Sequence, residues 1–304
     1  MSAEYHRLLL LFVDGVGLAP AAAGNPLAEE PSPTLRRLLG GPLTVEQCQR
    51  RDHLVLVPLD ATLNVPGLPQ SATGQASLFT GRNGAALLGR HQTGLPGPRM
   101  RRLVEEHGLF ARAVQAGLEV TFANAYGASY VAALERGERK PSVTTIGVRA
   151  AGLDLRSLDD LARGRAATWD LCRDLASRRA GVELEPIEAR QAGEHLAALA
   201  ALHRLTVFET FLTDLAGHLK RGVSPAEAVG RLDGAVEGLE AARSADLTWI
   251  LTSDHGNLED VRHGSHTRNP VPLLAVGPAA PYFADAGSIL DVVPALLRAL
   301  RVEE

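Results

Sequence analysis

Three apolar runs of this chain end at acidic residues, and this feature constrains the fold more than any other in the sequence. RLLLLFVDGVG reaches Asp14, LTVFETFLTD reaches Asp214, and LTWILTSDH reaches Asp254 and His255. Continuous apolar runs of this length are typical of central strands in a parallel sheet, which is buried on both faces. Ligands of such sheets bind beyond the carboxyl ends of the strands. The sequence therefore predicts that these polar side chains meet at one edge of a sheet.

Helical patterns separate the apolar runs. They include RMRRLVEEHGLFARAVQAG, AGEHLAALAALHR, SPAEAVGRLDGAVEGLEAARS and SILDVVPALLRAL. This alternation predicts the α/β fold class, with a mostly parallel central sheet and helices on both faces. Residues 128–190 are rich in Arg and Ala, with short helical patterns and few strong strands. We predict a small inserted cap there, which sets substrate specificity, and a catalytic core made of residues 1–127 and 191–304.

Charge and cysteine content narrow the partners and the compartment. The net charge is −4 and the arginines are scattered, so there is no electrostatic reason to expect nucleic acid or an anionic membrane as partner. The run LLLLFV is too short to cross a bilayer and leads directly into Asp14, which favours a strand over a signal peptide. Cys48 and Cys172 lie far apart without CxxC spacing, as in proteins of a reducing compartment. We expect a cytoplasmic protein that acts on a small molecule.

The polar residues at the run ends have the donor types of a metal site. TDLAGH places Asp214 and His218 four residues apart, on one face of a helical turn. Asp254 and His255 are adjacent, so their side chains diverge in extended backbone, which suits two metal ions, or a turn at the strand end, better than a single ion bound within a regular element. Each residue alone could be a helix cap or a solvated loop residue, but one shared site explains all of them together with His266. Carboxylates combined with imidazoles fit Mn²⁺ or Zn²⁺ better than Ca²⁺.

A candidate nucleophile lies in the segment NVPGLPQSATGQASLFTG, which places Ser71 or Thr73 near the start of a helix. A hydroxyl there faces free N–H groups and the positive end of the helix dipole, which favours a phosphorylated intermediate. A bound metal ion would lower the pKa of the hydroxyl and make it a nucleophile. A helix cap would also explain a serine at this position.

The motifs FVDGVG, QSATGQ, TDLAGH, TSDHGN and SHTRNPVP occur in an order that resembles the alkaline phosphatase superfamily. The branch that they resemble most is that of the cofactor-independent phosphoglycerate mutases and phosphopentomutases. The resemblance covers residues 7–82 and 205–298. TSDHGN and SHTRNPVP together are specific, whereas DGVG alone would be weak.

The resemblance implies a two-metal site with a serine nucleophile. One divalent ion would be bound by Asp14, Asp254 and His255, and the other by Asp214, His218 and His266. Ser71 would contact both ions and accept the phosphoryl group, with Thr73 as the alternative nucleophile. His263 would be an alternative ligand or a neighbour of the ligands. The cofactors implied are two divalent metal ions, Mn²⁺ or Zn²⁺.

Two departures from the resemblance concern the substrate. Gln75 stands where the mutases commonly have a histidine, and residues 128–190 are too short for the mutase lid with its arginine and aspartate motifs. The phosphopentomutase cap is not recognisable either. Other polar residues near the nucleophile loop or after the next strand are candidate substrate contacts: Asp60, Arg82, Asn83, His91, Arg99, Asn124 and Tyr126.

The implied function is phosphoryl transfer through a phosphoserine, on a small phosphorylated metabolite. Water as the acceptor would make the enzyme a phosphomonoesterase, and a substrate hydroxyl would make it a phosphomutase. Two alternatives stay open. The first is a phosphodiesterase or sulfatase of the same superfamily, although SATGQ lacks the CxPxR-like context of sulfatases. The second is a non-catalytic metal-binding protein on the same fold.

Overall fold

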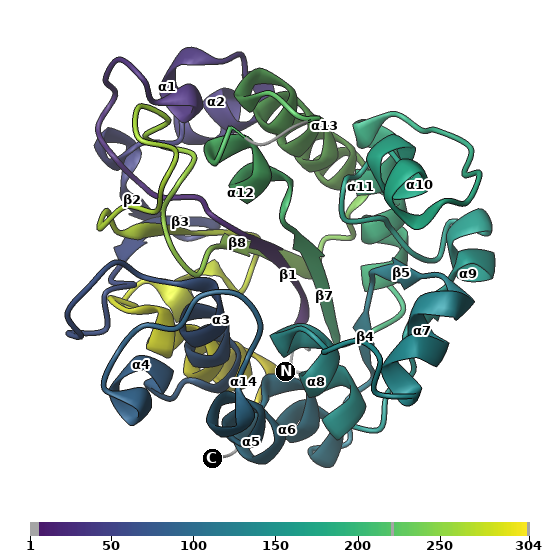
Figure 1. Cartoon of the computed structure of the whole chain (residues 1–304). Coiled ribbons are helices and arrows are strands. Elements are labelled where there is room, and N and C mark those ends of the chain that lie inside the picture. Colours follow the sequence, from purple (N-terminus) through teal and green to yellow (C-terminus); the bar gives the residue numbers. More distant parts are fainter. Residues whose placement is uncertain (1–5, 220–221, 303–304) are drawn as a thin grey trace, which may run out of the picture.

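A seven-stranded sheet forms the centre of the computed structural model, which describes residues 6–219 and 222–302. Its strands are β1 Arg7–Val13, β2 Gln49–Arg51, β3 Leu54–Leu59, β4 Val120–Phe122, β7 Leu205–Thr210, β8 Leu247–Thr252 and β9 Val271–Val276. Their order across the sheet is β2-β3-β9-β8-β1-β7-β4 (Figure 1). β1 therefore lies between β8 and β7, the two other strands that end near the predicted metal ligands.

Most strands of the sheet run in one direction, as the sequence predicts, and only β2 and β9 run in the other. β1 pairs in parallel with both β7 and β8, and β4 pairs in parallel with β7. β9 is antiparallel to β8 and to β3, and β2 is antiparallel to β3. Residues 253–270 connect β8 to β9 without a helix, and a parallel neighbour would need a crossover connection. The direction of β9 follows from this short return.

Helices cover both faces of the sheet, which confirms the predicted fold class (Figure 1). One face packs against α3 Ser71–Thr80, α5 Pro98–His107, α6 Leu109–Gln115, α8 Val143–Ala150 and α14 Val292–Leu300. The other packs against α2 Pro33–Leu39, α11 Ala189–Ala200 and α13 Pro225–Ala242. Leu8, Leu10 and Phe12 of β1 belong to the first core, and Leu9, Leu11 and Val13 to the second. The central strand is buried on both sides, as a continuous apolar run requires.

The remaining elements lie at the edges of this core. They are α1 Pro26–Glu29, α4 Gly84–Leu88, α7 Ala128–Glu135, α9 Leu158–Ala162, α10 Asp174–Ala180, α12 Leu212–Gly217, the strands β5 Ala125–Tyr126 and β6 Arg156–Ser157, and the 3₁₀ turns η1 Val45–Gln47, η2 Ala280–Phe283 and η3 Ile289–Asp291. None of the helices in the described ranges is long and apolar enough to cross a membrane.

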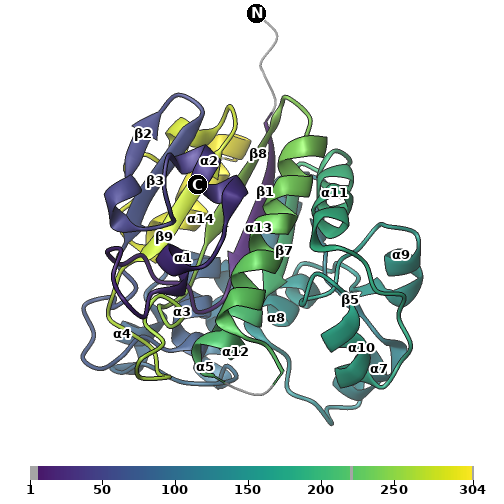
Figure 2. The ribbon, with the colours of Figure 1, turned by 90° about the horizontal axis from the view of Figure 1, so that it is seen from above.

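The segment 128–190 lies mainly beyond the β4 edge of the sheet. β5 and β6 form a small parallel pair there, and α7, α9 and α10 lie beside it (Figure 2). α8 belongs to the same stretch of sequence, yet its Val143, Ile146 and Val148 are part of the main core. The segment is thus anchored through α8, and the limits of the predicted cap stay a prediction.

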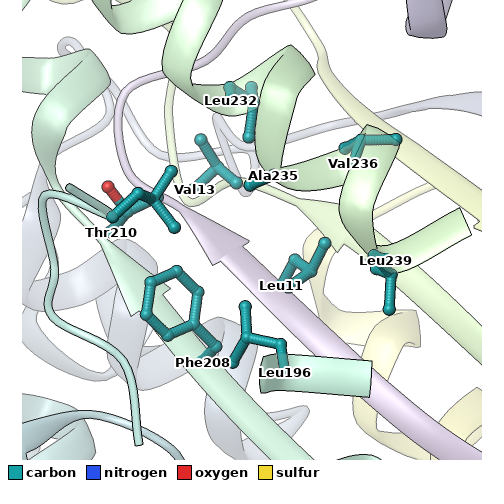
Figure 3. A pocket seen from close by; sticks show the side chains of 10 residues that line it. Leu11, Val13, Leu196, Phe208, Thr210, Leu232, Ala235, Val236 and Leu239 are labelled. Carbon is teal, nitrogen blue, oxygen red and sulfur yellow. The ribbon is translucent and has the colours of Figure 1, made fainter. Parts of the chain in front are cut away.

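An apolar pocket lies between the sheet and the helix pair α11 and α13. Figure 3 shows Leu11 of β1 and Phe208 of β7 on one side of it and Leu232 and Leu239 of α13 on the other. Apart from the hydroxyl of Thr210, these side chains offer only carbon atoms. The pocket has no group that could orient a polar ligand, so we assign it to the core.

Helices α11 and α13 cross with their backbones in contact, and two glycines permit this. A Cβ atom at Gly193 would lie 1.9 Å from the carbonyl oxygen of Ala235, and one at Gly238 would lie 1.8 Å from that of Arg190. Neither contact is possible for a larger residue unless the helices separate. This crossing holds α13 over the second core.

The crossing predicts opposite effects for two glycine-to-alanine substitutions. Gly193→Ala should lower the free energy of unfolding by about 1–3 kcal/mol, because the added methyl group forces the helices apart. Gly230→Ala, on an exposed turn of α13 with no atom within 4 Å, should raise it by about 0.5–1 kcal/mol through helix propensity. Urea unfolding measures both, and equal effects at the two sites would contradict the close crossing.

Candidate metal centre

The carboxyl ends of β1, β7 and β8 carry the predicted site residues to one edge of the sheet. Asp14 follows β1, and its N–H donates to the carbonyl oxygen of Thr210 at 2.9 Å, which extends the β1–β7 ladder to this point. Asp214 lies in α12, which begins directly after β7, and Asp254 and His255 follow β8. The parallel register forces these ends together, as the sequence predicts.

Asp14, Asp254 and His255 form a first group of donors, which is almost completely buried. His255 Nε2 lies 3.4 Å from Asp14 Oδ1 and 3.5 Å from Asp254 Oδ2. Asp14 Oδ1 and both carboxylate oxygens of Asp254 are buried without a hydrogen-bond donor. Buried carboxylate oxygens are nearly always satisfied by a donor or a cation. These three oxygens therefore fit a cation.

Without a bound ion, burial and mutual repulsion destabilise the charged carboxylates of this first group. Burial raises the pKa of Asp14 well above its usual value, and the nearby Asp254 and Asp214 carboxylates raise it further. Burial also raises the pKa of Asp254 to about 6. Burial lowers the pKa of His255 to about 3, so its imidazole is neutral at physiological pH and offers a lone pair. A divalent ion would relieve the repulsion between the carboxylates.

Asp214, His218 and His266 form a second group. His218 Nε2 lies 3.3 Å from Asp214 Oδ1 and 3.2 Å from His266 Nε2, and His266 Nε2 lies 3.7 Å from Asp214 Oδ1. The Nδ1 atoms of both histidines contact backbone carbonyls, those of Gly264 at 2.9 Å and Pro69 at 2.8 Å. Nδ1–H donation to a carbonyl leaves Nε2 with a free lone pair, the arrangement of metal-ligating histidines. Three lone pairs thus converge, and they also fit a cation.

His255 lies between the two groups. Its ring stacks on that of His266 with centroids 3.7 Å apart. Its donor atom is close to those of Asp214 and His266 as well as to those of Asp14 and Asp254. The two groups are therefore adjacent, and they can serve two neighbouring ions. The division of ligands between the ions remains a proposal.

The two candidate nucleophiles have different surroundings. Ser71 Oγ lies 3.1 Å from His255 Nε2, at the edge of the donor groups. Thr73 is completely buried; its hydroxyl donates to the carbonyl of Gln70 at 3.2 Å and accepts from the N–H of Gln92 at 3.1 Å. The Thr73 hydroxyl is thus engaged within the loop, and the geometry favours Ser71.

Close packing holds the start of α3 against the loop after β8. A Cβ atom at Gly74 would lie 2.8 Å from the carbonyl oxygen of Asp254, so only glycine allows this approach. The next residue, Gln75, donates from Nε2 to Asp14 Oδ2 at 3.2 Å. Gln75 therefore orients the Asp14 carboxylate and leaves Oδ1 facing His255.

Two residues that the sequence does not single out fix the ligand loops. Buried Glu259 accepts hydrogen bonds from the N–H groups of Gly17 and Asn257, both at 2.8 Å, and from the Thr267 hydroxyl. Asn257 Nδ2 donates to Asp214 Oδ1 at 2.7 Å. One carboxylate thus ties together the loops after β1 and β8 and the segment that follows His266. The tract TSDHGNLED contains both residues, but nothing in its pattern separates them from solvated loop residues.

Glu209 is a third residue that sequence reasoning misses. It lies on β7 inside an apolar run, is buried, and accepts a hydrogen bond from the Thr144 hydroxyl. Burial raises its pKa to about 7. Asn124, a candidate substrate contact, instead exchanges two hydrogen bonds with the Glu209 backbone. A charged residue within a buried strand was the available signal.

Several residues offered as site or substrate contacts lie elsewhere. His263 is exposed, and no described ligand group includes it. Asp60 accepts from the N–H and hydroxyl of Thr62, at 2.9 and 2.6 Å. Asn83 caps α4, and His91 Nε2 contacts the Thr62 carbonyl at 3.2 Å. Asp60, Asn83 and His91 shape loops in this structure.

Comparisons with known proteins show which family and which enzymes this chain is similar to. The family model of the Metalloenzyme superfamily matches residues 188–304. The 2,3-bisphosphoglycerate-independent phosphoglycerate mutase of Yersinia pestis (strain Pestoides F) is 35% identical over 98 residues, which are 30% of this chain and 19% of that enzyme. The mutase of the same name from Cereibacter sphaeroides (strain ATCC 17029) is 32% identical over 134 residues, 40% of this chain and 26% of the enzyme. The chain thus spans about a fifth to a quarter of these curated relatives.

Solved structures share the fold over nearly the whole chain. The PH0037 protein from Pyrococcus horikoshii superposes with a TM-score of 0.58 at 14% identity, covering 99% of both chains. The alkaline phosphatase from the Antarctic bacterium TAB5 superposes with a TM-score of 0.51 at 13% identity, covering 99% of this chain and 100% of the other. At this identity the likeness concerns the fold alone.

The buried charge of Asp254 predicts that its removal stabilises the metal-free protein. In metal-stripped protein near pH 8, Asp254→Asn should raise the free energy of unfolding by about 1–3 kcal/mol, because it removes a buried charge. The gain should shrink as the pH falls from about 6 to about 4. In that range the folded wild-type protein protonates Asp254, whereas the unfolded chain, with its ordinary pKa of 3.8, stays ionised. With Mn²⁺ added the order should reverse, because the variant loses a ligand.

Urea unfolding in EDTA and in Mn²⁺ at several pH values measures these differences. Asp260→Asn is the control, since hydrogen bonding from Arg262 lowers the pKa of that carboxyl and no gain is expected. A loss of stability in the metal-stripped Asp254 variant near pH 8 would show that the buried charge does not destabilise the folded protein.

Proposed function

Because the chain is an alkaline phosphatase-like protein of the metalloenzyme superfamily, we propose that it is a two-metal phosphoryl-transfer enzyme that uses Ser71 as its nucleophile. Its substrate would be a small phosphorylated metabolite. The observation that carries the proposal is the position of the Ser71 hydroxyl, 3.1 Å from His255 Nε2 and beside two adjacent groups of donors, one buried and one half-buried. A purely structural metal site would not need a partly exposed hydroxyl at a helix start.

The ligands in this proposal follow the two groups. Asp14, Asp254 and His255 would hold one ion. Asp214, His218 and His266 would hold the other. The mixture of carboxylates and imidazoles suits Mn²⁺ or Zn²⁺. When bound, such ions lower the pKa of a neighbouring hydroxyl and neutralise the charge that develops on a transferring phosphoryl group.

The residues of the chain carry the steps of the reaction. Ser71 Oγ gives its proton to water and attacks the phosphorus atom. The Oγ–P bond forms as the bond to the leaving oxygen breaks, and that oxygen takes a proton from water. The start of α3 contributes partial positive charge beside the phosphoserine. An incoming hydroxyl then attacks the phosphorus and loses its proton to solvent. The Oγ–P bond breaks, and Ser71 Oγ takes a proton from solvent. Gln75 and Asn257 hold the Asp14 and Asp214 carboxylates in place throughout.

The acceptor of the phosphoryl group decides between two activities. Water gives a phosphomonoesterase, and a hydroxyl of the retained substrate gives a phosphomutase. The partial likeness to phosphoglycerate mutases favours the second, whereas the short segment 128–190 favours the first. We keep both within the proposal. We also place the protein in the cytoplasm, since its two cysteines are free.

Ser71→Ala tests the nucleophile. The substitution should lower the turnover of p-nitrophenyl phosphate by about 10³-fold or more, because the covalent route is lost, while metal content stays near the wild-type level. Thr73→Val is the matched control and should keep most of the activity, because that hydroxyl serves the loop. An active Ser71 variant together with an inactive Thr73 variant would transfer the role to Thr73.

Metal analysis tests the ligand groups. The purified protein should hold about two divalent ions per chain, and Asp214→Ala and His266→Ala should each lose one. Combining Asp214→Ala with Asp254→Asn should remove both ions, because the two residues belong to different groups. Inductively coupled plasma mass spectrometry gives the counts. Retention of both ions in the Asp214 variant would refute the division of ligands.

A further inference from the structure

Two arginines of the segment 128–190 stack on aromatic rings near the end of β7. The Arg179 guanidinium lies 5.7 Å from the Trp169 ring centroid and 5.2 Å from that of Phe211, and these two rings stack on each other at 4.2 Å. The Arg139 guanidinium lies 5.8 Å from the Tyr130 centroid. We call these five residues the arginine–aromatic cluster.

The cluster lies on the same edge of the sheet as the metal centre. Phe211 precedes Asp214 by three residues and forms the N-cap of α12. Tyr130 stacks on Tyr126 with ring centroids 5.0 Å apart, and Tyr126 stacks on Phe122 at the end of β4, the strand beside β7, at 6.3 Å. Figure 2 shows α7, which carries Tyr130, and α10, which carries Arg179, at the level of α12. The cluster is therefore a neighbour of the metal centre, on its β4 side.

The positive charges of the cluster have no partner among the described residues. Both arginines are exposed, and neither guanidinium forms an ion pair or a hydrogen bond with a described residue. Their neighbours differ: Arg136 pairs with Glu138 at 2.7 Å, and Arg178 pairs with Asp174 at 3.3 Å. Ring stacking holds a guanidinium in place while leaving its N–H groups free to bind an anion in bidentate fashion.

We propose that Arg139 and Arg179 bind a second anionic group of the substrate, a carboxylate or a further phosphate, while the phosphoryl group to be transferred lies at the metal centre. This inference rests on the proposed function. It narrows the substrate to small phosphomonoesters that carry another acid group at their far end. It also gives the segment 128–190 a specific task, which is to select the substrate by charge.

Kinetics of the Mn²⁺-loaded enzyme test this selection. The substrates are linear alkyl phosphates of increasing chain length, whose far end carries a methyl group, a carboxylate or a second phosphate. At the chain length that fits, the enzyme should prefer an acid-bearing substrate over its methyl counterpart by about tenfold or more in kcat/KM. The preferred end group tells a carboxylate site from a phosphate site.

Substitutions assign the preference to the cluster. Arg179→Ala and Arg139→Ala should each raise KM for the preferred substrate severalfold with little change in kcat, and leave the methyl series unchanged. Arg179→Lys should restore part of the loss. Arg178→Ala, one residue away and paired with Asp174, is the matched control and should behave as wild type.

The outcomes separate the two proposals. If the methyl series is hydrolysed but no acid-bearing substrate is preferred at any length, or if the preference survives in the double variant of Arg139 and Arg179, the inference is wrong and the proposed function stands. If the metal-loaded enzyme neither releases phosphate from any of these esters nor becomes phosphorylated at Ser71 when incubated with them, the proposed function itself fails.

Discussion

Repulsion between three neighbouring carboxylates, two of them buried, is the constraint on which this structure depends. Asp14, Asp214 and Asp254 converge at one edge of the sheet, and their ion-pair partners among the described residues are histidines only. Such an arrangement costs free energy that local structure cannot offset. The apolar strands β1, β7 and β8 supply the compensation, since their side chains are buried on both faces of the sheet. The core thus holds in place charges that would otherwise separate, and a cation can then bind to a site already formed.

A second layer of hydrogen bonds converts this convergence into defined geometry. Glu259 joins three loops through its two carboxylate oxygens, and Asn257 fixes Asp214. Backbone carbonyls of Gly264 and Pro69 set the orientation of His218 and His266. None of these groups needs to contact an ion to matter, because each determines where a donor atom points. The loops that carry the ligands are therefore more ordered than their Gly- and Pro-rich sequence suggests.

The sequence predicts those parts of this arrangement that follow from a periodic or local pattern of residues. Apolar runs that stop at Asp14, Asp214 and Asp254 reveal the strands and their shared edge, because parallel pairing leaves few alternatives. Glu209 and Glu259 are not predicted in this way, because a single buried acid in a strand or loop does not form a periodic pattern. The antiparallel return of β9 depends on the path of residues 253–270, which no pattern encodes. Stacking of Trp169 on Phe211 joins residues from distant segments, so the arginine–aromatic cluster is visible only in three dimensions.

In the proposed reaction, the core and the segment 128–190 would have separate roles. Attack on the phosphorus of a phosphoserine is the same step for water and for a substrate hydroxyl, so the metal centre alone cannot choose the acceptor. The choice depends on whether the dephosphorylated molecule stays near Ser71 long enough to be phosphorylated again. A group that binds its far end would lengthen that stay, and this group must be held rigidly relative to Ser71. α8 provides the rigidity, because it packs against α3, which carries Ser71, while its own segment carries Arg139 and Arg179. The same anchoring would allow the segment 128–190, although short, to influence the proposed reaction at the sheet edge.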